Sequence, residues 1–168
     1  LGRIHTWEVF VDNYKTARNC GFESFEKFFF RWILNVLRRE DLRVKELIQH
    51  DESDCGAACL AIILSSYGRE TSIRKIREAA GTDKVGTSGY GIQEGAKKFG
   101  LDCKGLFCSE KEKVTEIPLP AILHFNKDGS EHYVVIYKVK KDFVYISDPA
   151  KGLRKIKKDE LFEVEIKN

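Results

Sequence analysis

The hydrophobic pattern of the chain changes from a helical to a strand-like period near residue 101. Before that point, apolar residues recur at helical spacing in three runs, and a glycine follows each run where a helix would end. The pattern therefore predicts three helices, with a loop at Thr82–Tyr90 between the second and the third. The helices are expected at Ala57–Tyr67, from a cap at Thr71 or Ser72 to Gly81, and at Gly91–Phe99.

After residue 101, β-branched and aromatic residues form short runs between turn residues, which is typical of strands. His132–Val139 and Phe143–Ser147 flank the polar segment Lys140–Asp142, so we expect them to form a hairpin. The remaining expected elements are strands at Leu101–Phe107, Ala121–Phe125 and Leu153–Ile156, and a helical turn at Asp159–Phe162. Helices followed by an antiparallel sheet predict an α+β fold.

The first 43 residues follow a different pattern. Aromatic and aliphatic residues from Phe22 to Leu37 are spaced so that they form one face of an amphipathic helix. We interpret residues 1–43 as an N-terminal extension and residues 44–168 as the main domain. A helix face this apolar needs a cover. That cover is either the main core or a second copy of the chain, or else a partner or a membrane surface.

Composition narrows the class of protein. The 168 residues suit one domain with an appendage, and the net charge of +3, with lysines in both halves, argues against a nucleic-acid partner. We interpret the basic run Lys151–Lys158 as a solvated surface. The first residues lack the charged-then-apolar pattern of a signal peptide, so none is expected, and no apolar stretch reaches membrane-spanning length. Its first residue is not methionine, which indicates a piece of a longer protein and leaves room for a membrane domain elsewhere.

The five cysteines do not form a C-x-x-C pair, so free thiols in a reducing cytoplasm are the simpler interpretation. The spacings between Cys55 and Cys59 and between Cys103 and Cys108 are poor matches to zinc sites. We expect neither a metal nor another cofactor.

The candidate chemistry starts at Cys55, at the expected N-terminus of the first apolar helix. The dipole of a helix stabilises a thiolate at that end, and a thiolate is the nucleophilic form of cysteine. Cys59 lies one turn further along among apolar residues, and we interpret it as a small core residue.

His132 and Asp148 are the expected partners of Cys55. Each lies eight residues from Lys140 at the hairpin turn, so antiparallel pairing is expected to bring their backbones side by side at one end of the sheet. A carboxylate beside an imidazole orients the ring and stabilises its charged form. His124 is the rival base, but no acid is expected to pair with it, and a packed strand histidine is the preferred interpretation.

Gln49 lies six residues before Cys55, a spacing found in papain-like proteases. Its side-chain amide can donate a hydrogen bond to an oxyanion that forms on a substrate carbonyl. With the backbone N–H of Cys55, it would form an oxyanion hole with two donors, each worth about 3 kcal/mol in the transition state.

These residues stand in four blocks that together resemble the peptidase C39 family. The blocks are the Gln49–Leu60 segment, Gly86-Thr87-x-x-Tyr90-Gly91, His132–Tyr137 and Asp148-Pro149. The resemblance covers about Val44 to Val164. It implies a papain-like fold and a cysteine endopeptidase that removes leader peptides after a double-glycine motif from bacteriocin- or lantibiotic-type precursors.

The same resemblance implies a role for each site residue. Cys55 would be the nucleophile, His132 the general base and acid, Asp148 the residue that orients His132, and Gln49 the oxyanion donor. The implied partners are a leader peptide, which binds as an amphipathic helix followed by Gly-Gly, and the membrane and ATPase domains of an ABC transporter. The implied location is the cytoplasm, at the inner face of the cell membrane.

Two alternatives stay open. One is a non-catalytic C39-like domain that only docks the exported peptide, and such versions lack a working nucleophile. The other is a papain-like transferase that uses the same residues. The presence of Cys55 together with all its expected partners favours the peptidase.

Overall fold

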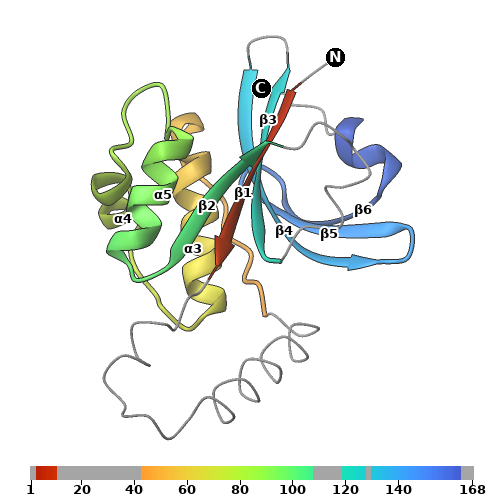
Figure 1. Cartoon of the computed structure of the whole chain (residues 1–168), viewed down its shortest axis with the longest axis horizontal. Coiled ribbons are helices and arrows are strands. Elements are labelled where there is room, and N and C mark those ends of the chain that lie inside the picture. Colours follow the sequence, from red (N-terminus) through yellow and green to blue (C-terminus); the bar gives the residue numbers. More distant parts are fainter. Residues whose placement is uncertain (1–2, 11–42, 108–118, 128–129, 164–168) are drawn as a thin grey trace, which may run out of the picture.

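The structure is a computed structural model that describes residues 3–10, 43–107, 119–127 and 130–163. Within these residues, three α-helices lie beside an antiparallel sheet (Figure 1). The helices are α3 (Cys55–Ser66), α4 (Ile73–Ala80) and α5 (Gly89–Lys98), and the short 3-10 helix η2 (Glu52–Asp54) leads into α3. The expected α+β layout is confirmed. None of the described helices is long and apolar enough to cross a membrane.

The strands of the described residues pair in the order β2-β1-β3-β4-β5-β6, and every neighbouring pair is antiparallel. A final 3-10 helix, η4 (Asp159–Glu163), follows β6. The hairpin of β4 and β5 is confirmed. The strands are β1 (Arg3–Phe10), β2 (Asp102–Phe107), β3 (Ala121–Lys127), β4 (Ser130–Lys140), β5 (Phe143–Asp148) and β6 (Gly152–Lys157).

Strand β1 was not expected from the sequence. It lies between β2 and β3, with Arg3–Glu8 paired to β3 and His5–Phe10 paired to β2. The first residues of the chain therefore connect β2 to the rest of the sheet. The predicted aromatic helix at Phe22–Leu37 lies outside the described residues, and the division of the chain at residue 43 stays a prediction.

Helix α3 is the centre of the fold. Ten of its twelve residues, Cys55 to Leu64, are buried, so it is apolar on every side, as a helix surrounded by other elements must be. One side of the sheet packs on α3 through Tyr133 and Val135 of β4. On the other side, β3, β4 and β5 share a second core with Ile156 and Leu161. The first residue of α3, Cys55, thus lies within the main core.

The ends of the neighbouring helices follow local capping rules. The Ser72 side chain accepts a hydrogen bond from the backbone N–H of Lys75, and Gly81 ends α4 with a φ of 64°, a conformation that glycine adopts without strain. Ser88 caps α5 in the same way. Helix α5 therefore begins at Gly89, and the predicted end of the preceding loop at Tyr90 was wrong by two residues.

Candidate active site

The nucleophile candidate is held by a short capped turn. Asp51 accepts a hydrogen bond from the backbone N–H of Ser53 at 2.9 Å, and the N–H of Asp54 donates to the Asp51 carbonyl at 3.0 Å. This turn forms η2, and α3 begins directly after it at Cys55. Cys55 is 6% exposed. The expected position of this thiol at a helix N-terminus is therefore the observed one.

His132 on β4 and Asp148 on β5 form the next part of the site. The Nε2 atom of His132 lies 2.8 Å from Oδ1 of Asp148, and a side-chain hydrogen bond links the same ring to Cys55. The structure thus brings Cys55, His132 and Asp148 into one hydrogen-bonded line. A ring bonded on one side to a carboxylate and on the other to a thiol can carry a proton between sulfur and a substrate atom.

The electrostatics of this line favour a charged imidazole. Burial by itself lowers the pKa of His132. The hydrogen bonds and charges of Asp148 and Cys55 outweigh burial and raise that pKa from 6.5 to about 9. Burial likewise raises the pKa of Asp148, but its hydrogen bonds to His132 and to the N–H of Ala150 make the net shift a lowering. The carboxylate is therefore ionised and the ring protonated at neutral pH.

The pairing of the two strands differs from the expected one. The turn of the hairpin is Lys141–Asp142, which alone would place Asp148 three residues along from His132, and a bulge between Ile136 and Lys138 reduces this offset to two. Val135 stands opposite Ser147, so continuing this register places Asp148 two residues along from His132. The two residues lie on adjacent strands at the same end, as expected, but diagonally. Their side chains span this offset.

Gln49 lies next to the end of β5. Its backbone N–H donates to the carbonyl of Pro149 at 2.8 Å, which fixes the residue beside Asp148. Its Oε1 atom is buried and has no hydrogen-bond partner among the described residues. The structure therefore places the Gln49 backbone next to Pro149, the residue after Asp148, and the role of the Gln49 amide as an oxyanion donor stays a prediction.

The other histidine and cysteine candidates are placed elsewhere. The His124 ring stacks on Tyr133, with centroids 4.2 Å apart, and its Nε2 lies 3.6 Å from a carboxylate oxygen of Glu131. The expectation that no acid pairs with His124 was therefore wrong. Cys59 is fully buried, and burial raises its pKa well above the ordinary value. It has the environment of a core residue. Within the described part of the chain, no group of three or more acidic, histidine or cysteine residues is arranged to hold a metal ion.

Comparison with known proteins decides the family. Residues 43–164 match the model of the peptidase C39 family. The chain belongs to the peptidase C39 family. The region of the match begins six residues before Gln49 and includes Cys55, His132 and Asp148.

Curated relatives of this C39 chain are bacterial exporters. It is 46% identical over 110 residues to the lactococcin-G-processing and transport ATP-binding protein LagD of Lactococcus lactis. The aligned region covers 64% of this chain and 16% of LagD. It is 31% identical over 133 residues to the colicin V secretion/processing ATP-binding protein CvaB of Escherichia coli. Here the aligned region covers 79% of this chain and 18% of CvaB. The chain therefore spans less than a fifth of the length of these relatives.

Solved structures show the same C39 fold. A double glycine motif protease from an AMS/PCAT transporter, in complex with its leader peptide, matches with a TM-score of 0.65 and 32% identity over 73% of this chain and 85% of that one. The peptidase domain of Streptococcus ComA matches with a TM-score of 0.63 and 29% identity over 72% of this chain and 91% of that one. The expected papain-like, α+β architecture of the C39 domain is confirmed.

One residue of this C39 site was missed in the sequence. Arg154 was interpreted as part of a solvated basic run, but its guanidinium is half-buried and lies 3.6 Å from Oδ2 of Asp148. The sequence signal for its burial was the alternation of inward and outward side chains along β6. Arg154 stands opposite Ile146, on the same sheet face as the buried Ile156. The carboxylate of Asp148 is thus approached by His132 at one oxygen and by Arg154 at the other.

Proposed function

We propose that this chain is a cysteine endopeptidase that cuts leader peptides after a double-glycine motif. The observation that carries the proposal is the hydrogen-bonded line from Cys55 through His132 to Asp148 within a peptidase C39 domain. The relatives support the substrate class, since they process and transport lactococcin G and colicin V, and a similar structure contains a bound leader peptide.

The mechanism follows from the order of the groups. The Cys55 thiolate attacks the carbonyl carbon of the second glycine, and the amide of Gln49 and the backbone N–H of Cys55 stabilise the resulting oxyanion. Protonated His132 gives its proton to the leaving amine, the C–N bond breaks, and a thioester forms. Water then attacks the thioester while neutral His132 accepts its proton. The leader leaves as a carboxylic acid and the thiolate is restored.

The role of Asp148 in this cycle is to hold the ring. Its hydrogen bond to Nε2 of His132 leaves the other ring nitrogen for the proton transfers at sulfur and at the leaving amine. Its negative charge stabilises the imidazolium that exists before the C–N bond breaks. Arg154, whose guanidinium lies 3.6 Å from the other carboxylate oxygen, helps to hold Asp148 in place by charge attraction.

The proposed partners come from the relatives. We expect the leader to bind as an amphipathic helix with its two glycines extended into the site. Transporter membrane and ATPase domains are expected in the parent chain or complex, with cleavage on the cytoplasmic side of the membrane. The alternative of a docking domain without catalysis is disfavoured because Cys55 is present and hydrogen-bonded to His132.

Two matched peptides test the substrate class. One carries a leader that ends in Gly-Gly, and the other has valine in place of the second glycine. We expect the first to be cut after the second glycine and the second to be cut at least about a hundredfold more slowly, because the family resemblance implies a narrow channel that larger side chains cannot enter. Equal rates for both peptides, measured by chromatography and mass spectrometry, would contradict the proposed specificity.

A further inference from the structure

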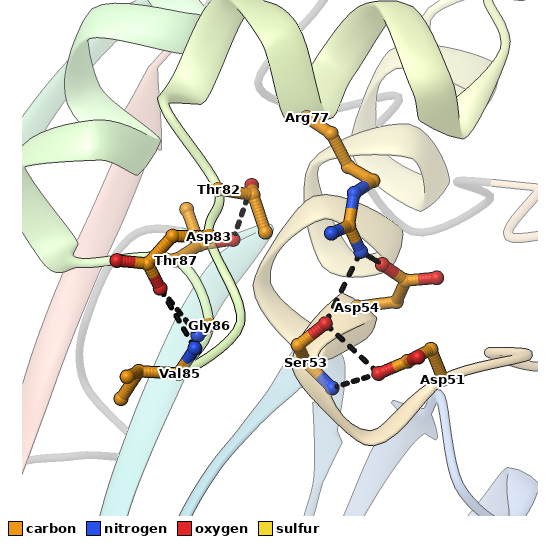
Figure 2. A network of polar contacts seen from close by, with 9 residues as sticks. All are labelled: Asp51, Ser53, Asp54, Arg77, Thr82, Asp83, Val85, Gly86 and Thr87. Atoms are coloured by element: carbon orange, nitrogen blue, oxygen red, sulfur yellow. Dashed lines mark hydrogen bonds and ion pairs between the residues drawn. The ribbon is translucent and has the colours of Figure 1, made fainter.

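The two residues that flank Cys55 in the chain, Asp54 and Gly56, are both contacted by one neighbouring segment, which runs from Arg77 on α4 to Thr87 in the loop before α5. Figure 2 shows Arg77 with Asp54, and Thr87 in this loop. We propose that Arg77 and Thr87 are positioning residues that fix the Cys55 thiol in line with His132. The inference rests on the proposed peptidase function and adds two residues to the machinery of that site.

The first contact is an ion pair just before the nucleophile. Nη1 of Arg77 bonds Oδ1 of Asp54, whose side chain is 10% exposed. The same nitrogen donates to the hydroxyl of Ser53 at 3.2 Å, and that hydroxyl donates to Asp51 at 2.9 Å. Figure 2 shows Arg77 reaching from its helix to both residues. One guanidinium on α4 therefore holds the whole turn that leads into α3.

The second contact is steric and comes just after the nucleophile. A Cβ atom built on Gly56 would lie 2.8 Å from Cβ and 3.1 Å from Oγ1 of Thr87, so the Thr87 side chain touches the backbone of the first turn of α3. Thr87 is buried, and its hydroxyl lies 2.8 Å from that of Thr82. The glycine at position 56 lets the two elements approach this closely, and the contact limits rotation of the turn that presents Cys55.

The loop that carries Thr87 is itself tied down. The carboxylate of Asp83 accepts hydrogen bonds from the backbone N–H groups of Val85, at 2.8 Å, and Gly86, at 3.1 Å. The N–H of Asp83 donates to the Gly86 carbonyl at 3.1 Å, which closes the turn. The loop is therefore held in one conformation by these hydrogen bonds, and Thr87 contacts α3 from a fixed position.

Helix α4 is a firm support for Arg77. A Cβ atom on Gly91 would lie 2.2 Å from the Ala80 carbonyl oxygen, and one on Gly95 would lie 3.1 Å from the Ala80 Cβ. Helices α4 and α5 thus pack in close contact. The start of α3 is held by this helical layer at Asp54 and Gly56, and by the sheet through the His132 ring. The distance between the Cys55 sulfur and the His132 imidazole therefore depends on how the helical layer and the sheet are positioned relative to each other.

The chemical consequence concerns the rate of attack. A displacement of about 1 Å at a reacting atom can lower a rate about a hundredfold. Loss of Arg77 would also leave the Asp54 carboxylate, in the turn just before Cys55, buried without its ion-pair partner, so this turn would be free to move. Both effects act on the step at sulfur, so we expect kcat to fall while KM changes little.

The test compares Arg77→Gln with Arg74→Gln. Arg74 lies on the same helix, and its ion pair with Glu78 is on the surface, so the control removes the same charge without touching α3. With a double-glycine leader peptide, we expect Arg77→Gln to lower kcat about tenfold to a hundredfold, with KM within about threefold of the wild-type value. Arg74→Gln is expected to match the wild type.

A second readout does not depend on peptidase activity. Alkylation of Cys55 by iodoacetamide, followed by peptide mass spectrometry well below the melting temperature of each variant, reports the reactivity of the thiol itself. We expect slower alkylation of Cys55 in Arg77→Gln, whereas a purely stabilising ion pair would lower the melting temperature and leave the alkylation rate of the folded protein unchanged.

Three results would overturn the inference. These are equal kcat in Arg77→Gln and Arg74→Gln, an unchanged alkylation rate of Cys55, or a fall in kcat fully matched by the unfolded fraction. If Arg77→Gln does not fold, Arg77→Lys, which keeps the charge, takes its place and must still show reduced kcat. A wild-type protein that alkylates at Cys55 but cuts no leader peptide would refute the proposed function, whereas the alkylation rates would still test the positioning role.

Discussion

At the scale of single residues, the site depends on the proton of His132. The ring is largely buried, and burial alone would favour its neutral form, but Asp148 and Cys55 hold it charged and raise its pKa to about 9. Because the pKa is raised, the imidazolium of His132 persists at neutral pH and loses its proton as the pH rises through about 9. An enzyme that needs this imidazolium to protonate the leaving amine loses activity above that pH.

Replacement of Asp148 by asparagine tests this balance. Without the carboxylate, the imidazolium loses its main partner, so the pKa of His132 falls and the alkaline limb of the profile of kcat/KM against pH moves down by about 1–2 pH units. We also expect roughly tenfold or more loss of kcat at pH 7. Asp142→Asn is the matched control, because Asp142 is exposed in the turn of the same hairpin. An alkaline limb in Asp148→Asn that coincides with the control would contradict the assigned role.

The residues of the site differed in how far the sequence could predict them. Cys55 and His132 were found because helix ends and hairpin geometry are local. The diagonal offset of Asp148 was missed because it depends on which residues form the hairpin turn and on a bulge, and a pattern of side-chain types does not reveal either. Arg154 was missed because the density of positive charge in Lys151–Lys158 concealed the alternation that turns one of its side chains inward.

At the scale of elements, β1 is the strand that changes the expected layout. The helices and the strands after residue 101 are short-range structures with their own caps and turns, such as Ser72 and Gly81 around α4. Strand β1 pairs with segments about a hundred residues away. Its sequence, Arg3–Phe10, is rich in β-branched and aromatic residues, which is the composition of a strand, but nothing local says which strands it joins.

Deletion of residues 1–10 tests the place of β1 in the sheet. Strand β2 would lose the neighbour that links it to β3, together with both hydrogen-bonded ladders of β1. Each hydrogen bond contributes about 0.5–1.5 kcal/mol, so we expect the free energy of unfolding to fall by at least about 3 kcal/mol. Urea denaturation followed by circular dichroism measures this. Deletion of residues 1–2, which leaves β1 whole, is the control, and equal stability of the two truncated proteins would refute the pairing.

At the scale of the whole molecule, the hydrogen-bonded line from Cys55 through His132 to Asp148 joins two layers. The helical layer, which lies beside the sheet in Figure 1, provides the thiol at the start of α3. The sheet provides the imidazole near the start of β4 and the carboxylate at the end of β5. The layer architecture followed from the order of helices and strands in the sequence. The meeting of Cys55 with His132 was also expected, but the buried packing of α3 on Tyr133 and Val135 that brings them together could not be predicted from the order of elements.

The central claim is that Cys55 is the nucleophile of a double-glycine peptidase. The most direct measurement is mass spectrometry of a double-glycine leader peptide after incubation with the wild-type protein, Cys55→Ala and Cys59→Ala. Cys59→Ala is the matched control, since it removes a fully buried thiol one turn further along the same helix. We expect cleavage after the second glycine by the wild type and by Cys59→Ala, and intact peptide with Cys55→Ala. Intact peptide with the wild type, or cleavage by purified Cys55→Ala, would contradict the account.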